Sequence, residues 1–318
     1  MNALITGGAG FIASHLAKSL LDSGNQVVCV DNFELGRLEN IKALLNDDKF
    51  SFFEEDVNNI EVLCEIVKNS NIDIIYHLAA NSDIQKSAKN PNIDFTNTLS
   101  TTISVLEVMR RCGVKNLFFA STSAVYGEKT NEILSEKTGE LAPISYYGAA
   151  KLASESYISA YSYMNDLNAL VFRFPNVIGP NLTHGVIFDF IKKLDKNPRE
   201  LEILGDGTQS KPYIYVMDLI EGIMLLSQKI EKCMNIYNVG VESSTTVTKI
   251  ADILCDKIGL KNVEYKYTGG SVGWKGDVPR FQYSMEKIYN RNWSPKYSSD
   301  EAVAKTIDFV LETMKESK

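Results

Sequence analysis

The sequence predicts an α/β protein built on a doubly wound parallel sheet, with a smaller C-terminal α/β lobe. Three observations support this prediction. Short apolar runs alternate with helix-like segments, a glycine-rich turn follows the first run, and prolines concentrate in the second half. Strand–helix alternation with right-handed crossovers produces a parallel sheet that helices cover on both faces. We therefore expect two domains, residues 1–174 and 175–318, with some later segments returning to the first.

The individual elements follow from the spacing of apolar residues. Six runs are short, apolar on both faces and rich in Val, Ile and Phe, as buried parallel strands are. They span residues 2–6, 26–30, 50–53, 73–78, 116–120 and 169–174. Helical spacing predicts helices at 11–24 and 146–163. Six of the eight prolines lie from Pro175 onward, where helices at 186–194 and 217–228 lack paired strands, which favours a separate smaller lobe.

Composition argues against several classes of partner. The 318 residues are 44% hydrophobic and carry a net charge of −7, and this mixed acidic surface argues against nucleic-acid binding. No apolar run approaches the roughly 20 residues that span a bilayer, and no signal peptide fits. The five cysteines and three histidines show no metal-ligand spacing, and His77 is expected in the core. We expect a cytoplasmic protein with reduced thiols, no metal and no membrane contact.

A dinucleotide-binding loop is predicted where the first strand runs into TGGAGFIA, residues 6–13. Gly8, Gly10 and Ala13 match the G-x-G-x-x-G/A fingerprint between a strand and a helix. The glycines permit a tight turn and a close pyrophosphate, and the helix N-terminus attracts the anion. Asp31 ends the second strand, where a carboxylate binds the ribose 2′-hydroxyl and repels a 2′-phosphate, which favours NAD over NADP. The alternative is a glycine turn without a cofactor.

The segment SYYGAAKLASE, residues 145–155, predicts a catalytic base. Helix positions i and i+4 share a face, so Lys151 lies beside Tyr147 rather than Tyr146. A phenol has a pKa near 10, and lowering it by about 3 units takes roughly 4 kcal/mol of differential stabilisation. We expect Lys151 and a nicotinamide cation to supply it, so that Tyr147 takes a proton from an alcohol while hydride leaves its carbon. The alternative is a Tyr–Lys pair on a solvated helix face.

A hydroxyl cluster follows the fifth strand-like run, in ASTSAVYG at residues 120–127. In open parallel sheets, ligands bind beyond the carboxyl ends of the strands. Thr122 or Ser123 is therefore expected to hydrogen-bond the reacting alcohol and share its proton. A plain Ser/Thr turn is the alternative.

Together these motifs resemble the extended short-chain dehydrogenase/reductase family, specifically its NAD-dependent nucleotide-sugar epimerases and dehydratases. The resemblance runs through TGGAGFI, DNFELGRLENI, EDV, YHLAA, STSAVYG, YYGAAK, RFPNVIGP, GDGTQSKPYIYVMDL and GDVPR. It implies a Rossmann-type NAD-binding domain, a substrate-binding lobe, tightly bound NAD that is regenerated at each turnover, and a homodimer. YIYVMDLIEG, residues 213–222, is especially similar to UDP-glucose/UDP-galactose 4-epimerases.

The resemblance also implies roles for individual residues. Thr122 falls at the family's catalytic Ser/Thr position, Tyr147 is the base, and Lys151 holds the nicotinamide ribose and the phenolate. The implied cofactor-binding residues are Gly7, Gly10, Phe11, Ile12, Asp31, Asn32, Asp56, Val57, Leu78, Ala79, Ala80, Tyr147 and Lys151. The implied substrate-binding residues are Ser123, Asn176, Val186, Lys211 and Arg280.

Among the family's reactions, the sequence favours epimerisation of a nucleotide-diphosphate sugar at C4 through a transient 4-keto intermediate. Family dehydratases carry an Asp–Glu pair directly after the catalytic Thr, where this chain has Ser123 and Ala124, which cannot act as acid and base. Reductases usually accept NADPH, which Asp31 disfavours. The alternatives are a 2-epimerase, a 4,6-dehydratase or a reductase on UDP-, CDP- or GDP-sugars, and an NAD-sensing protein without catalysis.

Two positions depart from the family pattern and leave the nucleotide and the sugar open. The family's phosphate-clamping arginine is Lys211 here, which keeps the charge and loses the bidentate fork. A second family arginine is replaced by Trp274. Either Lys275 or Arg280 compensates, or Trp274 stacks on a base or sugar, or it is a packing residue.

Overall fold

The computed structural model describes residues 1–129, 132–270, 276 and 278–316. The chain divides into two compact units. The first unit comprises Met1–Gly127, Gly139–Phe174 and Ile220–Tyr237, and the second comprises Glu128–Thr138, Pro175–Leu219 and Asn238–Lys318. The NAD-binding and substrate-binding roles that the sequence analysis gives to the two halves stay predictions.

The first unit is built on a seven-stranded sheet. Its strand order is β12-β7-β5-β4-β1-β2-β3, and the neighbouring pairs from β7 to β3 are parallel. The strands are β1 (Asn2–Thr6), β2 (Gln26–Asp31), β3 (Phe50–Glu54), β4 (Ile74–His77), β5 (Asn116–Thr122), β7 (Asn168–Phe174) and β12 (Met234–Asn238). The predicted Rossmann-type α/β fold is confirmed. The strand order reverses between β1 and β4, the kind of switch point beside which such sheets bind ligands.

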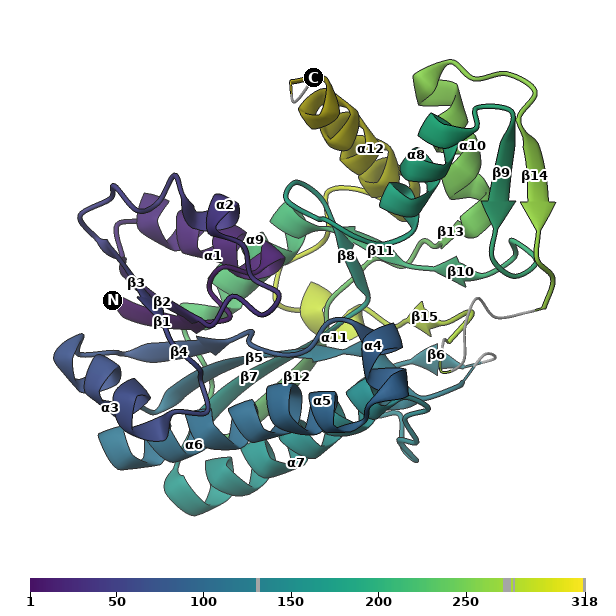
Figure 1. Cartoon of the computed structure of the whole chain (residues 1–318). Coiled ribbons are helices and arrows are strands. Elements are labelled where there is room, and N and C mark those ends of the chain that lie inside the picture. Colours follow the sequence, from purple (N-terminus) through teal and green to yellow (C-terminus); the bar gives the residue numbers. More distant parts are fainter. Residues whose placement is uncertain (130–131, 271–275, 277, 317–318) are drawn as a thin grey trace. The chain divides into compact units, whose positions relative to one another are not determined.

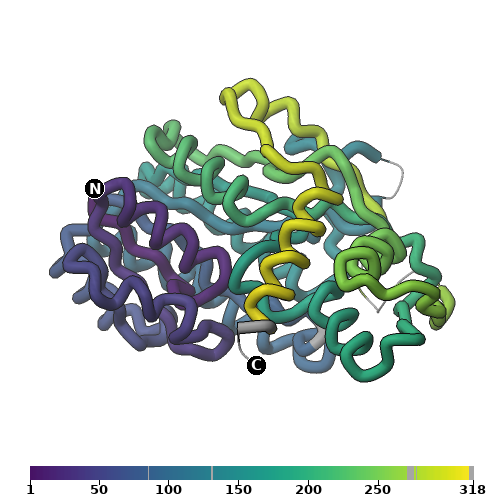
Figure 2. Tube along the Cα trace, turned by 90° about the horizontal axis from the view of Figure 1, so that it is seen from above, coloured from purple at the N-terminus to yellow at the C-terminus, as the bar shows by residue number. Residues whose placement is uncertain are grey.

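Helices cover both faces of this sheet (Figure 1). Helices α3, α6 and α7 lie on one face, whereas α1 and the later part of α9 lie on the other. Their bounds are α1 (Phe11–Asp22), α3 (Ile60–Asn69), α6 (Thr101–Cys112), α7 (Tyr146–Asn165) and α9 (Val216–Ser227). Shorter helices are α2 (Leu38–Ile41), α4 (Ile84–Lys89), α5 (Asn92–Asp94), the π-helix η1 (Phe95–Ser100) and the 3₁₀-helix η2 (Ser123–Tyr126). Figure 2 shows the N-terminal strand–helix segments, in purple, lying side by side.

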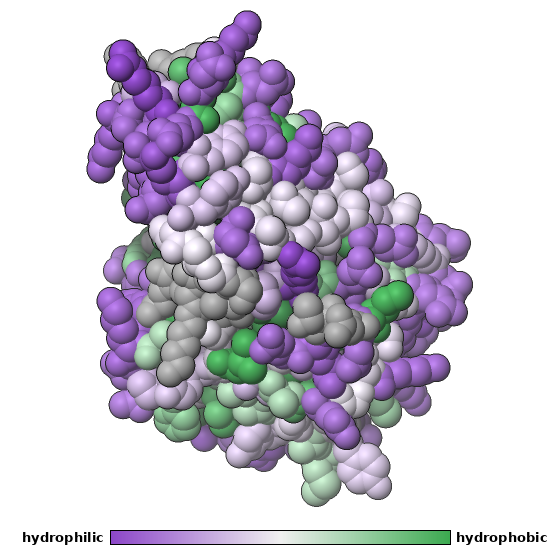
Figure 3. All heavy atoms as spheres, turned by 90° about the vertical axis from the view of Figure 1, so that its right-hand side faces the viewer, coloured by the Kyte–Doolittle hydropathy of each residue, from purple (hydrophilic) through white to green (hydrophobic). Residues whose placement is uncertain are grey.

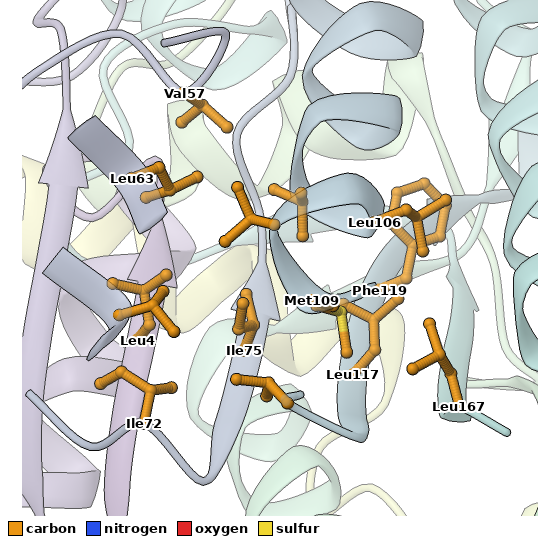
Figure 4. Packing of buried hydrophobic residues seen from close by; sticks show 14 of the residues in the cluster. Leu4, Val57, Leu63, Ile72, Ile75, Leu106, Met109, Leu117, Phe119 and Leu167 are labelled. Carbon is orange, nitrogen blue, oxygen red and sulfur yellow. The ribbon is translucent and has the colours of Figure 1, made fainter. Parts of the chain in front are cut away.

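A continuous apolar core joins the strands to α3 and α6 (Figure 4). Leu4, Ile75 and Leu117 come from neighbouring strands, and Leu63 and Leu106 come from the two helices. All five side chains have no exposed surface. Each such burial contributes roughly 1.5–3 kcal/mol, so the strands and their carboxyl ends are held firmly in register.

The second unit has short sheets and a core of its own. Its strand pairs are β11–β8, β14–β9 and β15–β6, all parallel, and β10–β13, which is antiparallel. Phe190, Leu254 and Ile307 bury the inner faces of α8, α10 and α12 in this core. The helices are α8 (Val186–Lys196), α10 (Val247–Ile258), α11 (Glu286–Tyr289) and α12 (Ser299–Glu316). The strands are β6 (Ile133–Leu134), β8 (Asn176–Ile178), β9 (Glu200–Ile203), β10 (Ser210–Lys211), β11 (Tyr213–Tyr215), β13 (Thr245–Thr246), β14 (Glu264–Tyr267) and β15 (Gln282–Tyr283).

Hydrophilic residues predominate on the face in Figure 3, and hydrophobic ones form small separate groups there. Within the described ranges, no helix combines the length and apolar character that a bilayer crossing requires. The same part of the chain holds no group of three His, Cys, Asp or Glu side chains that suits a metal ion. All five cysteines are free thiols.

Candidate active site

The carboxyl ends of five neighbouring strands carry the predicted cofactor and catalytic residues of the first unit. Asp56 follows β3, Asp31 ends β2, Gly7 follows β1, Ala79 follows β4 and Thr122 ends β5. Because these strands are parallel and adjacent, their carboxyl ends meet along one edge of the sheet. Residues from distant parts of the sequence are therefore assembled at a single edge.

The loop between β1 and α1 presents an uncapped helix N-terminus at this edge. Gly7 adopts a φ of +69°, and the Gly7 and Gly8 amides donate to the Val30 carbonyl at 2.8 and 3.2 Å. A Cβ on Gly7 would lie 2.8 Å from the Ala79 nitrogen, so the segment after β4 packs directly against the turn. No side chain caps the first turn of α1, which begins at Phe11. Its amide groups remain available to bind an anion such as a pyrophosphate.

Asp31 lies beside this loop and fits a ribose. Its Oδ2 accepts from the Ala9 amide at 3.0 Å and its Oδ1 from the Phe33 amide at 2.8 Å. Burial raises the pKa of Asp31, and the two amide bonds oppose that rise. A carboxylate has about four acceptor positions, so two remain after these bonds. The uncapped helix end and this carboxylate therefore fit a dinucleotide that has a free 2′-hydroxyl.

The other predicted cofactor residues lie along the same edge. Asn32 Nδ2 lies 3.4 Å from Asp56 Oδ2, which links the ends of β2 and β3. The Leu78 amide donates to the Thr6 carbonyl at 3.2 Å and the Ala79 amide to Thr6 Oγ1 at 3.3 Å, which holds the segment after β4 against β1. Three of the remaining members are half-buried, namely Phe11, Ile12 and Ala80, and Val57 is buried.

The three predicted catalytic residues meet where α7 packs against the end of β5. Ser145 caps α7 through its hydroxyl group. The Thr122 side chain lies close enough to the Tyr147 hydroxyl group to lower its pKa, and Lys151 Nζ lies 6.0 Å from the centre of the Tyr147 ring. Tyr146 is 52% exposed. The tyrosine one helical turn before Lys151 is therefore the one that meets the strand.

Lys151 is held in place by the strand itself. Its Nζ donates to the Ala120 carbonyl at 2.6 Å and lies 4.7 Å from the centre of the Phe119 ring. The side chain is only 2% exposed. A lysine buried in this way is a fixed donor rather than a mobile surface charge.

In the chain without a bound cofactor, burial has the largest effect on the pKa values of Tyr147 and Lys151. It raises the pKa of Tyr147 to about 12, while the neighbouring Thr122 side chain opposes the rise and the charge of Asp94 adds to it. Burial also lowers the pKa of Lys151 to about 7, against the charges of Glu155 and Asp94. The sequence argument expects the pKa of Tyr147 to fall. In the chain alone it rises, because removing a phenolate from water costs more than the neighbouring Thr122 side chain offsets.

A buried chain of side chains connects the cofactor loop to α7, and sequence reasoning missed it. His77 Nδ1 lies 2.7 Å from Thr6 Oγ1, His77 Nε2 lies 3.1 Å from Thr102 Oγ1, and Ser154 donates to Thr102 at 3.0 Å. Thr102 donates its own proton to a backbone carbonyl at 2.8 Å, so it accepts from His77 and the ring proton lies on Nε2. Burial, followed by the charge of Lys151, lowers the pKa of His77 to about 3. The ring is neutral at physiological pH, and its expected place in the core is confirmed, since it is 1% exposed.

The lowered pKa values of His77 and Lys151 predict that the free energy of unfolding rises with pH. The unfolded chain binds more protons than the folded chain between about pH 3 and 6.5 for His77 and between about 7 and 10.5 for Lys151. Stability is therefore gained as pH increases through each range. We expect urea unfolding of the cofactor-free protein to show such a rise from about pH 7 to 9. Lys151→Met should remove this rise, and Lys18→Met, at an exposed lysine of α1, should keep it; equal slopes in both variants would contradict the assignment.

A buried ion pair between Glu155 and Arg173 was also missed. The two side chains are each 4% exposed and approach to 2.6 Å. The sequence signal is Arg173 itself, a charged residue in an otherwise apolar strand run, because a buried charge requires a partner. Glu155 lies one helical turn after Lys151 and therefore on the same helix face, so it could have been identified as the partner of Arg173.

Of the four predicted substrate residues in the second unit, two lie on neighbouring segments, namely Lys211 and Arg280. Lys211 belongs to β10, and Arg280 forms a backbone bridge with the adjacent Ser210. Arg280 Nη2 also donates to Thr208 Oγ1 at 2.7 Å. The other two begin elements of their own, β8 at Asn176 and α8 at Val186.

Three further positions complete the predicted set. Ser123 begins η2 directly after Thr122 and is half-buried. Trp274 and Lys275, which occupy or flank a family arginine position, lie outside the described residues.

Comparison with known proteins identifies the family of the chain. The NAD dependent epimerase/dehydratase family matches residues 3–240. The UDP-glucose 4-epimerase of Mycolicibacterium smegmatis is 29% identical over 315 residues, which cover 97% of this chain and 98% of that protein.

Solved structures are similar over the whole chain. The Thermus thermophilus UDP-glucose 4-epimerase in complex with NAD has a TM-score of 0.86 and 31% identity, covering 97% of this chain and 98% of that one. The Thermotoga maritima UDP-glucose 4-epimerase with UDP-glucose has a TM-score of 0.87 and 30% identity, covering 99% and 100%.

Relatives with a different reaction are about as similar in sequence. The dTDP-D-glucose 4,6-dehydratase of Mus musculus is 29% identical over 318 residues, covering 96% of this chain and 87% of that protein. Because the family match extends from the first strand of the sheet through the cofactor loop and α7, the chain belongs to the NAD dependent epimerase/dehydratase family and has NAD as its cofactor.

Proposed function

We propose that this chain catalyses NAD-dependent epimerisation of a nucleotide-diphosphate sugar at C4, as UDP-glucose 4-epimerases do. The observation that supports it most directly is the placement of Thr122 next to Tyr147, beside the buried Lys151, at the edge that also carries the cofactor loop. A UDP-sugar is the first substrate to consider, because the Thermotoga maritima relative is described with UDP-glucose.

The side chains of the protein hold and move the proton in this proposal. Thr122 and Tyr147 bind the C4 hydroxyl through their own hydroxyl groups. Tyr147 takes up the hydroxyl proton as the C4–H bond breaks and returns it when the 4-keto oxygen is reduced. Lys151 favours the phenolate of Tyr147. Bound NAD supplies the hydride acceptor, the hydride donor and a positive ring charge, which a phenol with a pKa near 12 needs in order to ionise at neutral pH.

Residues next to the catalytic pair support epimerisation over the family's other reactions. Ser123 and Ala124 begin η2 directly after Thr122, and neither side chain supplies the acid and base that elimination of water requires. Asp31 supports NAD rather than NADPH, which argues against a reductase.

The remaining roles belong to the same proposal. The cofactor set around the β1–α1 loop binds NAD, with Asp31 on the adenosine ribose. Lys211 and Arg280 supply positive charge for the substrate diphosphate, and their neighbouring segments support a shared task. Asn176, Val186 and Ser123 are assigned to the same substrate. The homodimer and the cytoplasmic location stay predictions.

The identity of the product tests the proposal. We expect the purified protein to convert at least one of UDP-glucose, UDP-GlcNAc and their uronates to the C4 epimer, as measured by chromatography and proton NMR. Free NADH should not accumulate, because hydride is returned in every turnover. Stoichiometric NADH, or a 4-keto-6-deoxy product, would contradict C4 epimerisation and support an oxidoreductase or a dehydratase.

A further inference from the structure

Three consecutive residues at the end of β5 each lie against a different α7 residue, and these α7 residues are spaced four apart. Positions i, i+4 and i+8 of a helix lie on one face, so a single face of α7 contacts the strand end at three successive points. Two of these contacts belong to the catalytic cluster described above, and the third has no role there. The three pairs are Thr122–Tyr147, Ala120–Lys151 and Ser121–Glu155.

The third contact ties α7 to two strands at once. Ser121 Oγ donates to Glu155 Oε1 at 2.5 Å. Arg173 Nε donates to the same oxygen at 3.0 Å, and Arg173 Nη2 donates to Glu155 Oε2 at 2.6 Å. Ser121 and Arg173 are register partners on β5 and β7. The Glu155 carboxylate therefore bridges two adjacent strands at Ser121, the residue that precedes Thr122.

Arg173 is itself fixed within the first unit. Its guanidinium carbon lies 4.8 Å from the centre of the Tyr126 ring in η2, the turn that Thr122 leads into. Bidentate Arg–carboxylate pairs fix orientation as well as distance. The pair therefore holds α7, β7 and the turn after β5 in one arrangement.

Glu155 also faces the charge of Lys151. The titratable groups around that ammonium are Glu155, Asp94, His77 and Tyr147. Burial lowers the pKa of Lys151, and the larger of the two opposing charges is Glu155, with Asp94 second. The His77 ring is neutral and contributes no compensating charge.

We propose that Glu155, clamped by Arg173, is a positioning residue of this active site. It sets α7 on β5 so that Tyr147 meets Thr122, and it keeps Lys151 a cation. Its kinetic consequence rests on the proposed epimerase function. The effect of Glu155 on the charge of Lys151 is independent of that function.

The electrostatic consequence is tested by NMR titration of the full-length protein as purified, with labelled lysine side chains. The Lys151 signal is identified by its loss in Lys151→Met. We expect Glu155→Gln to lower the midpoint of the Lys151 titration by about 1 pH unit. Ser121→Ala removes the strand contact and keeps the carboxylate, so it should leave the midpoint in place. Asp308→Asn, at a surface pair with Lys257, should also leave it in place.

A second variant guards against misfolding. Glu155→Gln leaves Arg173 buried without its partner, which destabilises proteins strongly. The double variant Glu155→Gln/Arg173→Met removes both charges and retains apolar volume. The midpoint of Lys151 should fall in this variant too, and an unchanged midpoint in whichever variant folds overturns the proposal.

Kinetics then separate positioning from a purely structural role. In Glu155→Gln we expect kcat to fall about tenfold or more with little change in KM, and the alkaline limb of the kcat profile to move to lower pH. Ser121→Ala should lower kcat without moving that limb. A wild-type profile in Glu155→Gln would overturn the proposal. If the wild-type protein has no epimerase activity, the proposed function fails, and the Lys151 titration still decides whether Glu155 holds its charge.

Discussion

Tyr147→Phe is expected to lower turnover by about 10²–10⁴-fold while the protein keeps its fold and its NAD. The substitution removes only the hydroxyl group that lies next to Thr122. The aromatic ring stays, and so does its packing near Lys151, 6.0 Å from the ring centre. Without the phenol, no group at this position can take the proton of the C4 hydroxyl.

Tyr146→Phe provides the matched control on the same helix. Tyr146 precedes Tyr147 by one residue but is 52% exposed, so losing its hydroxyl group should leave kcat unchanged. The measurements are kcat with the active sugar nucleotide and the NAD content of the denatured protein. Normal turnover in Tyr147→Phe, or an equal loss in Tyr146→Phe, would remove Tyr147 from the role of base.

Gly7→Ala is expected to abolish stable NAD binding and to lower the melting temperature markedly. A Cβ at this position would lie 2.8 Å from the Ala79 nitrogen, 2.9 Å from the Ala79 Cα and 3.1 Å from the Leu78 carbonyl carbon. All three are backbone atoms of the segment that follows β4, so no side-chain rotation relieves the contact. The positive φ of +69° adds a conformational cost of roughly 1–2 kcal/mol.

Gly113→Ala separates the steric effect from the conformational one. Gly113 caps α6 with a φ of +78°, and a Cβ there would meet no atom within 4 Å. The free energy of unfolding of this variant should fall by only roughly 1–2 kcal/mol, the conformational cost of alanine in the left-handed region, and the variant should retain NAD. Thermal melting and the ratio of bound NAD to protein measure both variants. Similar behaviour of the two alanine variants would show that the contact with the segment after β4 is unimportant.

Element boundaries show where local pattern stops being sufficient. The run at 116–120 predicts a strand, with the hydroxyl cluster after it. In the structure β5 continues to Thr122, because Ser121 and Thr122 pair with Arg173 and Phe174 of β7. Backbone pairing with a neighbouring strand outweighs the low apolar content of this tail. Ser121 and Thr122 thus gain fixed positions in the sheet instead of places in a flexible turn.

The sequence by itself determined the α/β class, six of the seven strands of the large sheet and the glycine-rich loop after the first of them. These depend on residue spacing along a strand or helix, which is local and readable. Spacing also singled out Tyr147 over Tyr146, because four residues make nearly one helical turn.

Only the tertiary structure decided what surrounds those residues. It joined Glu155 to Ser121 and Arg173, and it connected the cofactor loop to α7 through His77. It also shows that, in the chain without NAD, the pKa of Tyr147 is raised, since burial outweighs the effect of the Thr122 side chain. Desolvation and buried hydrogen bonds depend on which distant segments become neighbours in space, and no local pattern contains that information.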